Sequence, residues 1–218
     1  WALRVRVWSF AARECVVALV AHHIVADGES MAPLMTDVMT AYAARVAGEA
    51  PAFASLPIQF ADFAIWQHRT LGNANDPESV VGAQVAYWSG QLEGLPDVLG
   101  LPSDRVRPRV ASQRGARVDY EVPASVASRI VAVAREQNVT PFMVVHAALA
   151  VLLARLSASG DIAVGTPIAG RGRPELDPLI GMFVNTLVLR TQVEPDMSFD
   201  ELIEQVRRTD LDAFANAD

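Results

Sequence analysis

Two neighbouring segments at the start of the chain show the hydrophobic patterns of strands. Residues 2–8 alternate apolar and basic side chains, which is the period of a half-exposed strand. After a short break at residues 11–14, an apolar run covers residues 15–21. We expect the two segments to form an antiparallel pair.

Helical spacing of apolar positions dominates most of the remaining chain. Residues 29–46 are predicted to form a helix that Asp27 or Ser30 caps and that stops near Gly48. The same spacing predicts helices at residues 58–71, 78–92, 124–137 and 140–156. A last helix is expected from Ser198, because Glu201 three residues later completes a capping box.

A proline-containing stretch separates the two halves of this pattern. Residues 94–109 hold three prolines and are predicted to cross between two lobes in an extended conformation. Further strands are expected at residues 114–122, 162–167 and 185–191. The mixture of strands and long helices indicates the α/β class. The predicted organisation is the end of an N-terminal lobe at 1–93, a crossing segment at 94–110 and part of a C-terminal lobe at 111–218.

Composition removes several kinds of chemistry. All 18 basic residues are arginine, which excludes Schiff-base lysines, pyridoxal-phosphate enzymes and P-loops. Cys15 is the single cysteine, so we expect no internal disulfide, no cysteine-rich zinc site and a reducing, cytoplasmic location. The net charge of −7 argues against nucleic acid, and no membrane or export signal is visible. Because the chain starts at Trp1, we expect it to be a piece of a longer protein.

The strongest chemical signal is the sequence HHIVADG at residues 22–28, where the second predicted strand ends. Adjacent side chains point to opposite faces of a strand, so one histidine is expected to work and the other to support it. Asp27 follows across a turn that Gly28 permits, and the group has the composition of a base with its orienter. Zinc is not expected, because adjacent histidines diverge and His68 and His146 lie in helices without a ligand pattern.

Four separated motifs, taken in order, resemble the condensation domains of nonribosomal peptide synthetases, which are related to chloramphenicol acetyltransferase. They are HHIVADG at 22–28, YW at 87–88 with LPSDRVRP at 101–108, GTPIAGR at 165–171, and IGMFVNT at 180–186. Val106 stands where the family has a proline. The resemblance implies a two-lobed chloramphenicol acetyltransferase-like fold, about half of which this chain covers. The chain on its own is therefore expected to be inactive.

The resemblance also implies residue roles. His23 is the family's active-site residue, expected to accept a proton from the attacking amine or to orient it. His22 supports it, and Asp27 is architectural, held in a salt bridge with an arginine; Arg190 is one candidate, and a residue of the N-terminal segment that precedes this chain is the alternative. Gly28 is expected near the developing oxyanion. Asn185 is expected to reach the substrate tunnel from the other lobe.

The implied reaction forms an amide between two carrier-bound acyl thioesters, with a donor of L configuration. The partners would be donor and acceptor peptidyl carrier domains, which bring their own phosphopantetheine arms, and an adjacent adenylation domain. No cofactor bound directly to this chain is implied.

Two other kinds of protein remain open. One is an epimerization domain or a coenzyme A-dependent acyltransferase of the same superfamily. An epimerization domain usually has a tryptophan soon after the motif's serine, whereas Met31 follows Ser30 here. The other is a non-catalytic domain that docks a partner, but such relatives tend to lose the paired histidines.

Overall fold

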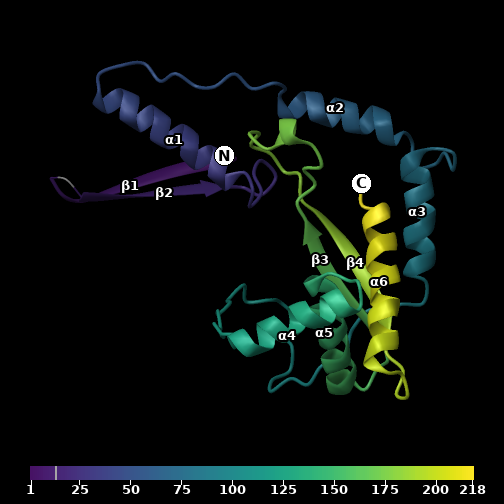
Figure 1. The fold of residues 1–218 in the computed structure, drawn as a ribbon. Coiled ribbons are helices and arrows are strands. Elements are labelled where there is room, and N and C mark those ends of the chain that lie inside the picture. Colours follow the sequence, from purple (N-terminus) through teal and green to yellow (C-terminus); the bar gives the residue numbers. More distant parts are fainter. Residues whose placement is uncertain (13) are drawn as a thin grey trace. The chain divides into compact units, whose positions relative to one another are not determined.

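The computed structural model describes residues 1–12 and 14–218, and its contacts divide the chain into two compact units. The first, which we call the motif unit, consists of residues 1–85, 167–186 and 218. The second, the helical unit, consists of residues 86–166 and 187–217. Each unit therefore combines segments that are far apart in the sequence (Figure 1). The expected lobe boundary at residues 94–110 stays a prediction.

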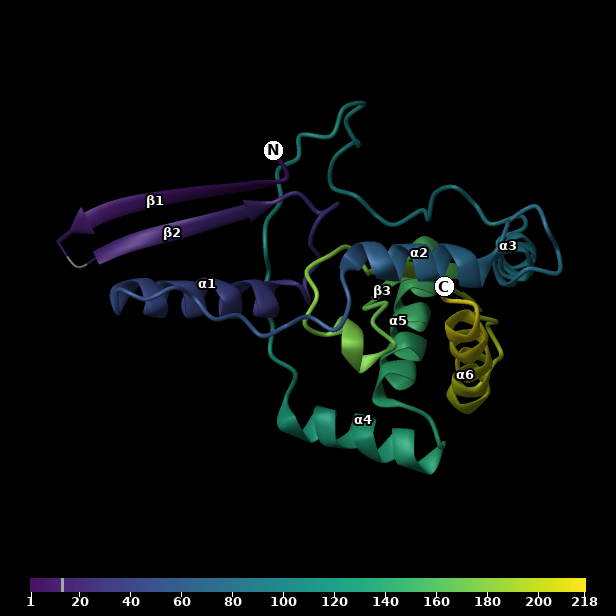
Figure 2. The same ribbon diagram turned by 90° about the horizontal axis from the view of Figure 1, so that it is seen from above.

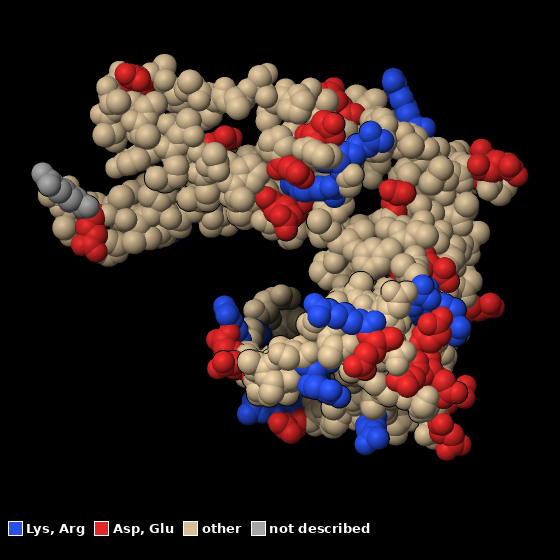
Figure 3. All heavy atoms as spheres, viewed as in Figure 1, with Lys and Arg blue, Asp and Glu red and all other residues tan. Residues whose placement is uncertain are grey.

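The motif unit begins with a two-stranded antiparallel hairpin, as predicted. Strand β1, Leu3–Ala11, pairs with β2, Glu14–Ala21, in a register that sets Val7 opposite Val17. Both of these valines are exposed, Val7 at 61% and Val17 at 49%. On the face drawn in Figure 3, the hairpin and the helix after it show mainly uncharged surface.

Helices follow the hairpin at nearly the predicted positions. They are α1, Met31–Val46, α2, Phe60–Leu71, and α3, Val80–Gln91, of which α3 passes from the motif unit into the helical unit. Helix α1 ends two residues before Gly48, whose φ of +78° suits the glycine expected to stop it. A capping box between Gln59 and Asp62 starts α2.

An aromatic core holds the motif unit together next to the histidine motif. The ring of Phe183 lies edge-on to Phe60 at 5.1 Å and tilted against Phe63 at 4.9 Å between ring centroids. Leu176, at the end of the 3-10 turn η1, Pro174–Leu176, and Leu179 complete the buried cluster. This core fixes the segment on either side of Phe183, which the site uses.

The helical unit has its own core and contains most of the second sheet. Its helices are α4, Ala124–Glu136, α5, Pro141–Ser157, and α6, Phe199–Ala215, and its sheet pairs β3, Asp161–Ile168, with β4, Asn185–Gln192. Helix α5 packs against both α4 and α6 (Figure 2). The predicted capping box at Ser198 and Glu201 is confirmed. These elements and the hairpin together confirm the α/β class.

One predicted strand is wrong. Residues 92–123 contain no helix or strand, so the alternating stretch at 114–122 is irregular. Its side chains are exposed, as at Val118 and Tyr120, both above 80%. A strand needs a neighbour for its backbone hydrogen bonds, and no strand of the described chain pairs with this segment. The expectation that 94–109 holds no regular helix is confirmed.

Candidate active site

The turn that carries the two histidines is closed by His22 itself. The backbone N–H of His22 donates to the carbonyl of Ala2 at 2.8 Å, which continues the hairpin ladder. The N–H of Ile24 then donates to Nδ1 of His22 at 3.1 Å. Because Nδ1 accepts this bond, the proton of a neutral His22 ring lies on Nε2. His22 therefore shapes the turn, in agreement with its expected supporting role.

His23, the residue expected to do the chemistry, has an exposed side chain. Within residues 1–12 and 14–218, no group hydrogen-bonds to its ring. Its neighbour Ile24 is also exposed, at 70%. The ring is accessible to a ligand, and its catalytic role stays a prediction.

Asp27 is buried, with 4% of its surface exposed, and its carboxylate is fully engaged. Oδ1 accepts from the backbone N–H of Ser30 at 2.9 Å, from its hydroxyl at 2.7 Å and from Arg171 at 3.2 Å. Oδ2 accepts from the backbone N–H of Phe183 at 3.0 Å. None of these partners is a histidine. Asp27 therefore does not orient a histidine ring, and its geometry is that of the architectural residue implied by the resemblance.

The hydrogen bonds also decide the charge of Asp27. Burial by itself raises the pKa of the carboxyl, but the bonds from Ser30, Phe183 and Arg171 outweigh it and lower the pKa from 3.8 to about 2. The group is therefore ionised near neutral pH. A carboxyl with so low a pKa is a poor general base, because it binds a proton only weakly.

Arg171 is the partner of Asp27, so the candidate Arg190 was wrong. Its guanidinium bonds Asp27 and the Ser30 hydroxyl through Nη2, at 3.2 and 3.0 Å, and the carbonyls of Leu176 and Leu179 through Nη1. The Phe183 ring lies 4.0 Å from the guanidinium carbon, in cation–π geometry. With 5% of its side chain exposed, Arg171 ties the histidine turn to residues 176–183.

Arg190 has a different structural role within the helical unit. Its Nε and Nη2 form a two-point ion pair with Asp161, at 2.9 and 2.7 Å, and Nη1 donates to the carbonyls of Gln91 and Glu93. The hydrogen bonds from Arg190 lower the pKa of Asp161, and the same contact raises the pKa of Arg190. Arg190 thereby anchors the end of α3 to the second sheet.

The structure requires glycine at two positions of the site, and Gly28 is not one of them. A Cβ on Gly28 would meet nothing within 4 Å, and Gly28 has no left-handed backbone, so the turn itself does not need glycine. At Gly170, whose φ is +64°, a Cβ would lie 2.0 Å from the Phe183 carbonyl oxygen. At Gly181 it would lie 2.2 Å from the Phe60 ring. The expected place of Gly28 near an oxyanion stays a prediction.

Asn185 begins β4 and belongs by its contacts to the motif unit, together with the histidines. Its side-chain oxygen accepts from the backbone N–H of Thr186 at 2.8 Å, which is a local bond typical of asparagine at the end of a loop. The amide side chain is exposed. Its expected contact with substrate stays a prediction.

The contributions of Ser30 and Arg171 to the site were missed by the sequence reasoning. The sequence pattern predicts Ser30 only as a possible helix cap. Its hydroxyl makes no capping bond, because it bonds Asp27 and the carbonyl of Gly181. Arg171 closes the GTPIAGR motif, which was used only to support the resemblance. The signal that points to Arg171 is its place in the GTPIAGR motif, and Ser30 lies two residues after the HHIVADG motif.

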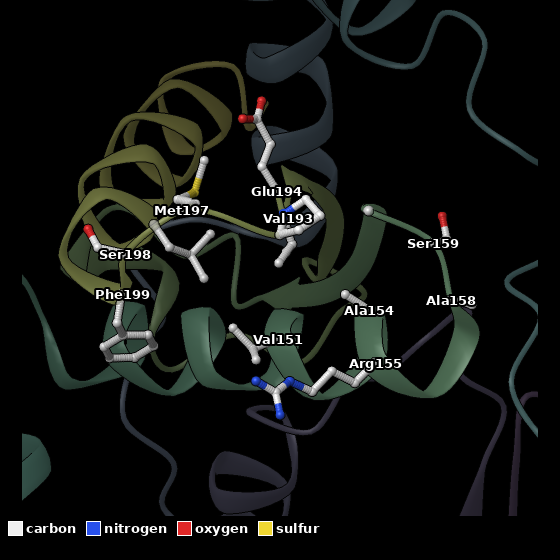
Figure 4. A pocket seen from close by; sticks show the side chains of 13 residues that line it. Val151, Ala154, Arg155, Ala158, Ser159, Val193, Glu194, Met197, Ser198 and Phe199 are labelled. Atoms are coloured by element: carbon white, nitrogen blue, oxygen red, sulfur yellow. The ribbon is translucent and has the colours of Figure 1, made fainter.

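A cavity lies in the helical unit, between the end of α5 and the start of α6 (Figure 4). Its volume is about 520 Å³, and its charged lining residues are Arg155 and Glu194. It is otherwise lined by apolar, small and hydroxyl side chains, and no histidine or cysteine reaches it. The cavity lacks a base or nucleophile pattern, so the histidine turn remains the candidate active site.

Among residues 1–12 and 14–218, no three side chains of His, Cys, Asp or Glu gather as they would around a metal ion. No individual helix in the same residues has both the length and the apolarity to cross a membrane. Helices α4 and α5 are long and apolar enough only when taken together, and the chain bends by 107° between them.

Comparison with known proteins identifies the family. The family model for the condensation domain matches residues 2–218. The chain is 52% identical over 215 residues to isonitrile lipopeptide synthase of Mycobacterium tuberculosis, and 44% identical over 217 residues to dimodular nonribosomal peptide synthase of Bacillus subtilis. These matches cover 98% and 100% of this chain but only 9% of each relative.

Solved structures show the same fold. The X-domain in its complex with OxyB from teicoplanin biosynthesis superposes with a TM-score of 0.92 at 32% identity, over 99% of this chain and 47% of that one. The first condensation domain of the CDA synthetase has a TM-score of 0.68 at 23% identity, over 99% and 46%, a likeness in fold alone. The chain belongs to the condensation domain family of nonribosomal peptide synthetases, with the chloramphenicol acetyltransferase-like fold that the motifs implied, and spans about half the length of these solved chains.

Proposed function

We propose that the chain contributes the histidine-bearing part of an amide-forming condensation site. The observation that carries the proposal is the pairing of an exposed His23 with a turn whose shape is locked by His22, Asp27 and Arg171. A base must meet its substrate, so its ring has to be accessible, and its backbone has to be rigid for the approach to be reproducible. The family membership supplies the reaction class.

The substrates are an acyl thioester and an amine, each delivered on the phosphopantetheine arm of a carrier domain. The neutral amine attacks the thioester carbonyl, a C–N bond forms, the C–S bond breaks, and the amine loses one proton. The leaving thiolate takes up one proton, so the reaction balances without an external acid. An α-amino group has a pKa of about 8, which leaves a usable neutral fraction near pH 7.

His23 accepts the proton from the attacking amine in this proposal and passes it toward the leaving sulfur. General-base assistance of this kind contributes about 10²- to 10⁴-fold to a rate. Asp27 takes no part in proton transfer, because its low pKa keeps it ionised and its oxygens already accept four hydrogen bonds. Adjoining carrier and adenylation domains, as expected for such a synthetase, would load and deliver both substrates.

The test is amide formation between two loaded carriers by a synthetase that contains this chain. We expect His23→Ala to lower the rate at least about 100-fold, because the proton acceptor is lost. His68→Ala is the matched control, since His68 is an exposed histidine on α2 away from the motif, and it should leave the rate unchanged. A His23→Ala variant that turns over like the parent would contradict the role of His23.

Docking of a partner is the second candidate function, and one observation favours it. The superposition on the X-domain bound to OxyB, with a TM-score of 0.92, is closer than that on the CDA condensation domain, with 0.68. The retained histidine pair argues for catalysis instead. If the parent synthetase formed no amide from correctly loaded carriers, docking would become the better explanation.

A further inference from the structure

The hydroxyl of Ser30 lies at the centre of the polar network behind the histidine turn. Ser30 has no exposed surface. Its Oγ lies within hydrogen-bond distance of Asp27 Oδ1 at 2.7 Å, of the Gly181 carbonyl at 2.9 Å, and of the Gly181 N–H at 3.1 Å. Arg171 donates to the same oxygen at 3.0 Å. One hydroxyl therefore contacts three separate segments of the motif unit.

Ser30 and Gly181 join two segments that are 151 residues apart in the chain. The Gly181 N–H donates to Ser30 Oγ, while the Gly181 carbonyl accepts from the backbone N–H of Asp27 at 3.1 Å. The turn at 27–30 and the segment from 181 are thus held backbone to backbone, with one hydroxyl completing the contact. A hydroxyl suits this place because it accepts and donates at once.

Gly181 is also packed closely against the aromatic core. A Cβ on Gly181 would lie 2.2 Å from an atom of the Phe60 ring, so a side chain at this position would displace that core. Asn185 lies four residues after Gly181, and His23 lies seven residues before Ser30. The contact therefore lies between the proposed base and the loop that leads to β4.

We propose that Ser30 is a positioning residue of the condensation site, which fixes the histidine turn against the 181–185 segment. The inference rests on the proposed function, because it assigns Ser30 a task in that reaction. In this proposal Ser30 neither contacts the substrate nor transfers a proton. Its removal should misplace the two segments relative to each other, and a misplacement of about 1 Å costs on the order of 100-fold in rate.

The first experiment measures amide formation by the synthetase carrying Ser30→Ala. We expect kcat to fall about 10- to 100-fold while the KM for either carrier changes less than about threefold, because alignment is lost but carrier binding is not. The pH dependence of kcat should keep the parent's shape, since the proton acceptor is unchanged. Ser30→Cys, which fills the same space with a weaker hydrogen-bonding group, should recover part of the loss.

A stability-matched control separates positioning from general weakening of the fold. Val206→Ala removes a fully buried side chain from the core of the helical unit and should destabilise the protein without touching the site. Assayed below its unfolding temperature, it should keep the parent's kcat. If Val206→Ala lost as much activity as Ser30→Ala, or if Ser30→Ala turned over like the parent, the positioning role would be refuted.

The second experiment does not depend on activity. Hydrogen exchange of the 218-residue chain should show the Gly181 amide exchanging about tenfold faster in Ser30→Ala, because its acceptor is gone. The Phe183 amide, whose acceptor is Asp27, should change less and serves as an internal reference. Ser30→Cys gives the same readout with a smaller change if Ser30→Ala does not fold. Unchanged exchange at Gly181 would overturn the inference, whereas a parent without amide-forming activity would overturn only the proposed function.

Discussion

Single residues in the site are held by partners that are distant in the sequence. Asp27 keeps its charge in a buried place because Ser30, Phe183 and Arg171 donate to it. The sequence located Asp27 and its resemblance implied an arginine partner, with Arg190 as the candidate, but the partner is Arg171, 144 residues away. Only the folded chain determines which guanidinium reaches the carboxylate, since Arg171 follows β3 and Arg190 lies within its partner strand β4.

The low pKa of Asp27 makes a contribution to stability that depends on pH. Because its pKa is depressed in the folded state, this contribution is complete above about pH 4 and is lost as the pH falls toward 2. Asp27→Asn lacks it. We expect the difference in free energy of unfolding between the parent and Asp27→Asn to shrink by about 2 kcal/mol from pH 5 to pH 2.

Urea unfolding at a series of pH values measures this difference. The difference is the relevant quantity, because the pKa values of Asp161 and Glu201 are also lowered and affect both proteins alike. Asp37→Asn, which changes an exposed carboxylate on α1, is the control and should follow the parent at every pH. A gap between the parent and Asp27→Asn that stays constant down to pH 2 would contradict the assignment.

At the scale of helices and strands, hydrophobic periodicity and capping residues predicted the elements that depend only on their own segment. The helices, the second strand of the hairpin and the capping box at Ser198 lie within about two residues of their predicted places, and β1 ends three residues later than predicted, because periodicity and capping are properties of the segment itself. The strand expected at 114–122 failed because its alternation says nothing about a pairing neighbour. A strand forms only where a second segment pairs with its backbone N–H and C=O groups.

A buried polar pair links two of these helices. His146 on α5 and Asp210 on α6 lie 3.0 Å apart, with 3% and 0% of their side chains exposed, and Thr191 on β4 approaches the other ring nitrogen at 3.5 Å. The second oxygen of Asp210 has no hydrogen-bond partner in the described chain. The pair therefore carries a desolvation cost that it only partly recovers.

We expect a double-mutant cycle to show strong coupling between the two side chains. His146→Leu and Asp210→Leu should each lower the free energy of unfolding by about 3 kcal/mol, because each leaves a buried polar partner unmatched. The double variant should cost clearly less than their sum, as measured by denaturant unfolding. Additive single effects would show that the two side chains do not interact.

At the scale of the whole chain, the exposed apolar surface of the hairpin is the most unusual feature. A two-stranded hairpin is marginally stable by itself, and most of its side chains here are exposed on both faces, with only Ala18, Leu19 and Ala21 partly buried. The alternation of apolar and basic residues predicted that one face of the hairpin is exposed to solvent. It could not show that much of the other face is exposed as well, since burial depends on which segments pack against the strands.

We expect the isolated 218-residue chain to self-associate through this surface. Val7→Lys should lower the average mass seen in light scattering and the binding of an apolar dye, because it places a charge in the middle of the hairpin. Val106→Lys is the control, since Val106 is 96% exposed and lies in the irregular segment of the helical unit. Equal effects of the two substitutions would argue against the hairpin as the contact.

The distance in sequence between the partners of Asp27 has a consequence for synthesis on the ribosome. The carboxylate of Asp27 meets the backbone of Phe183, which is added 156 residues later. At about 5 to 20 residues per second, the nascent chain spends roughly 8 to 30 s with an aspartate whose partner Phe183 does not yet exist. The histidine turn can therefore take its final shape only after Phe183 has been added, and the pace of synthesis from residue 27 to residue 183 sets the earliest moment at which it does.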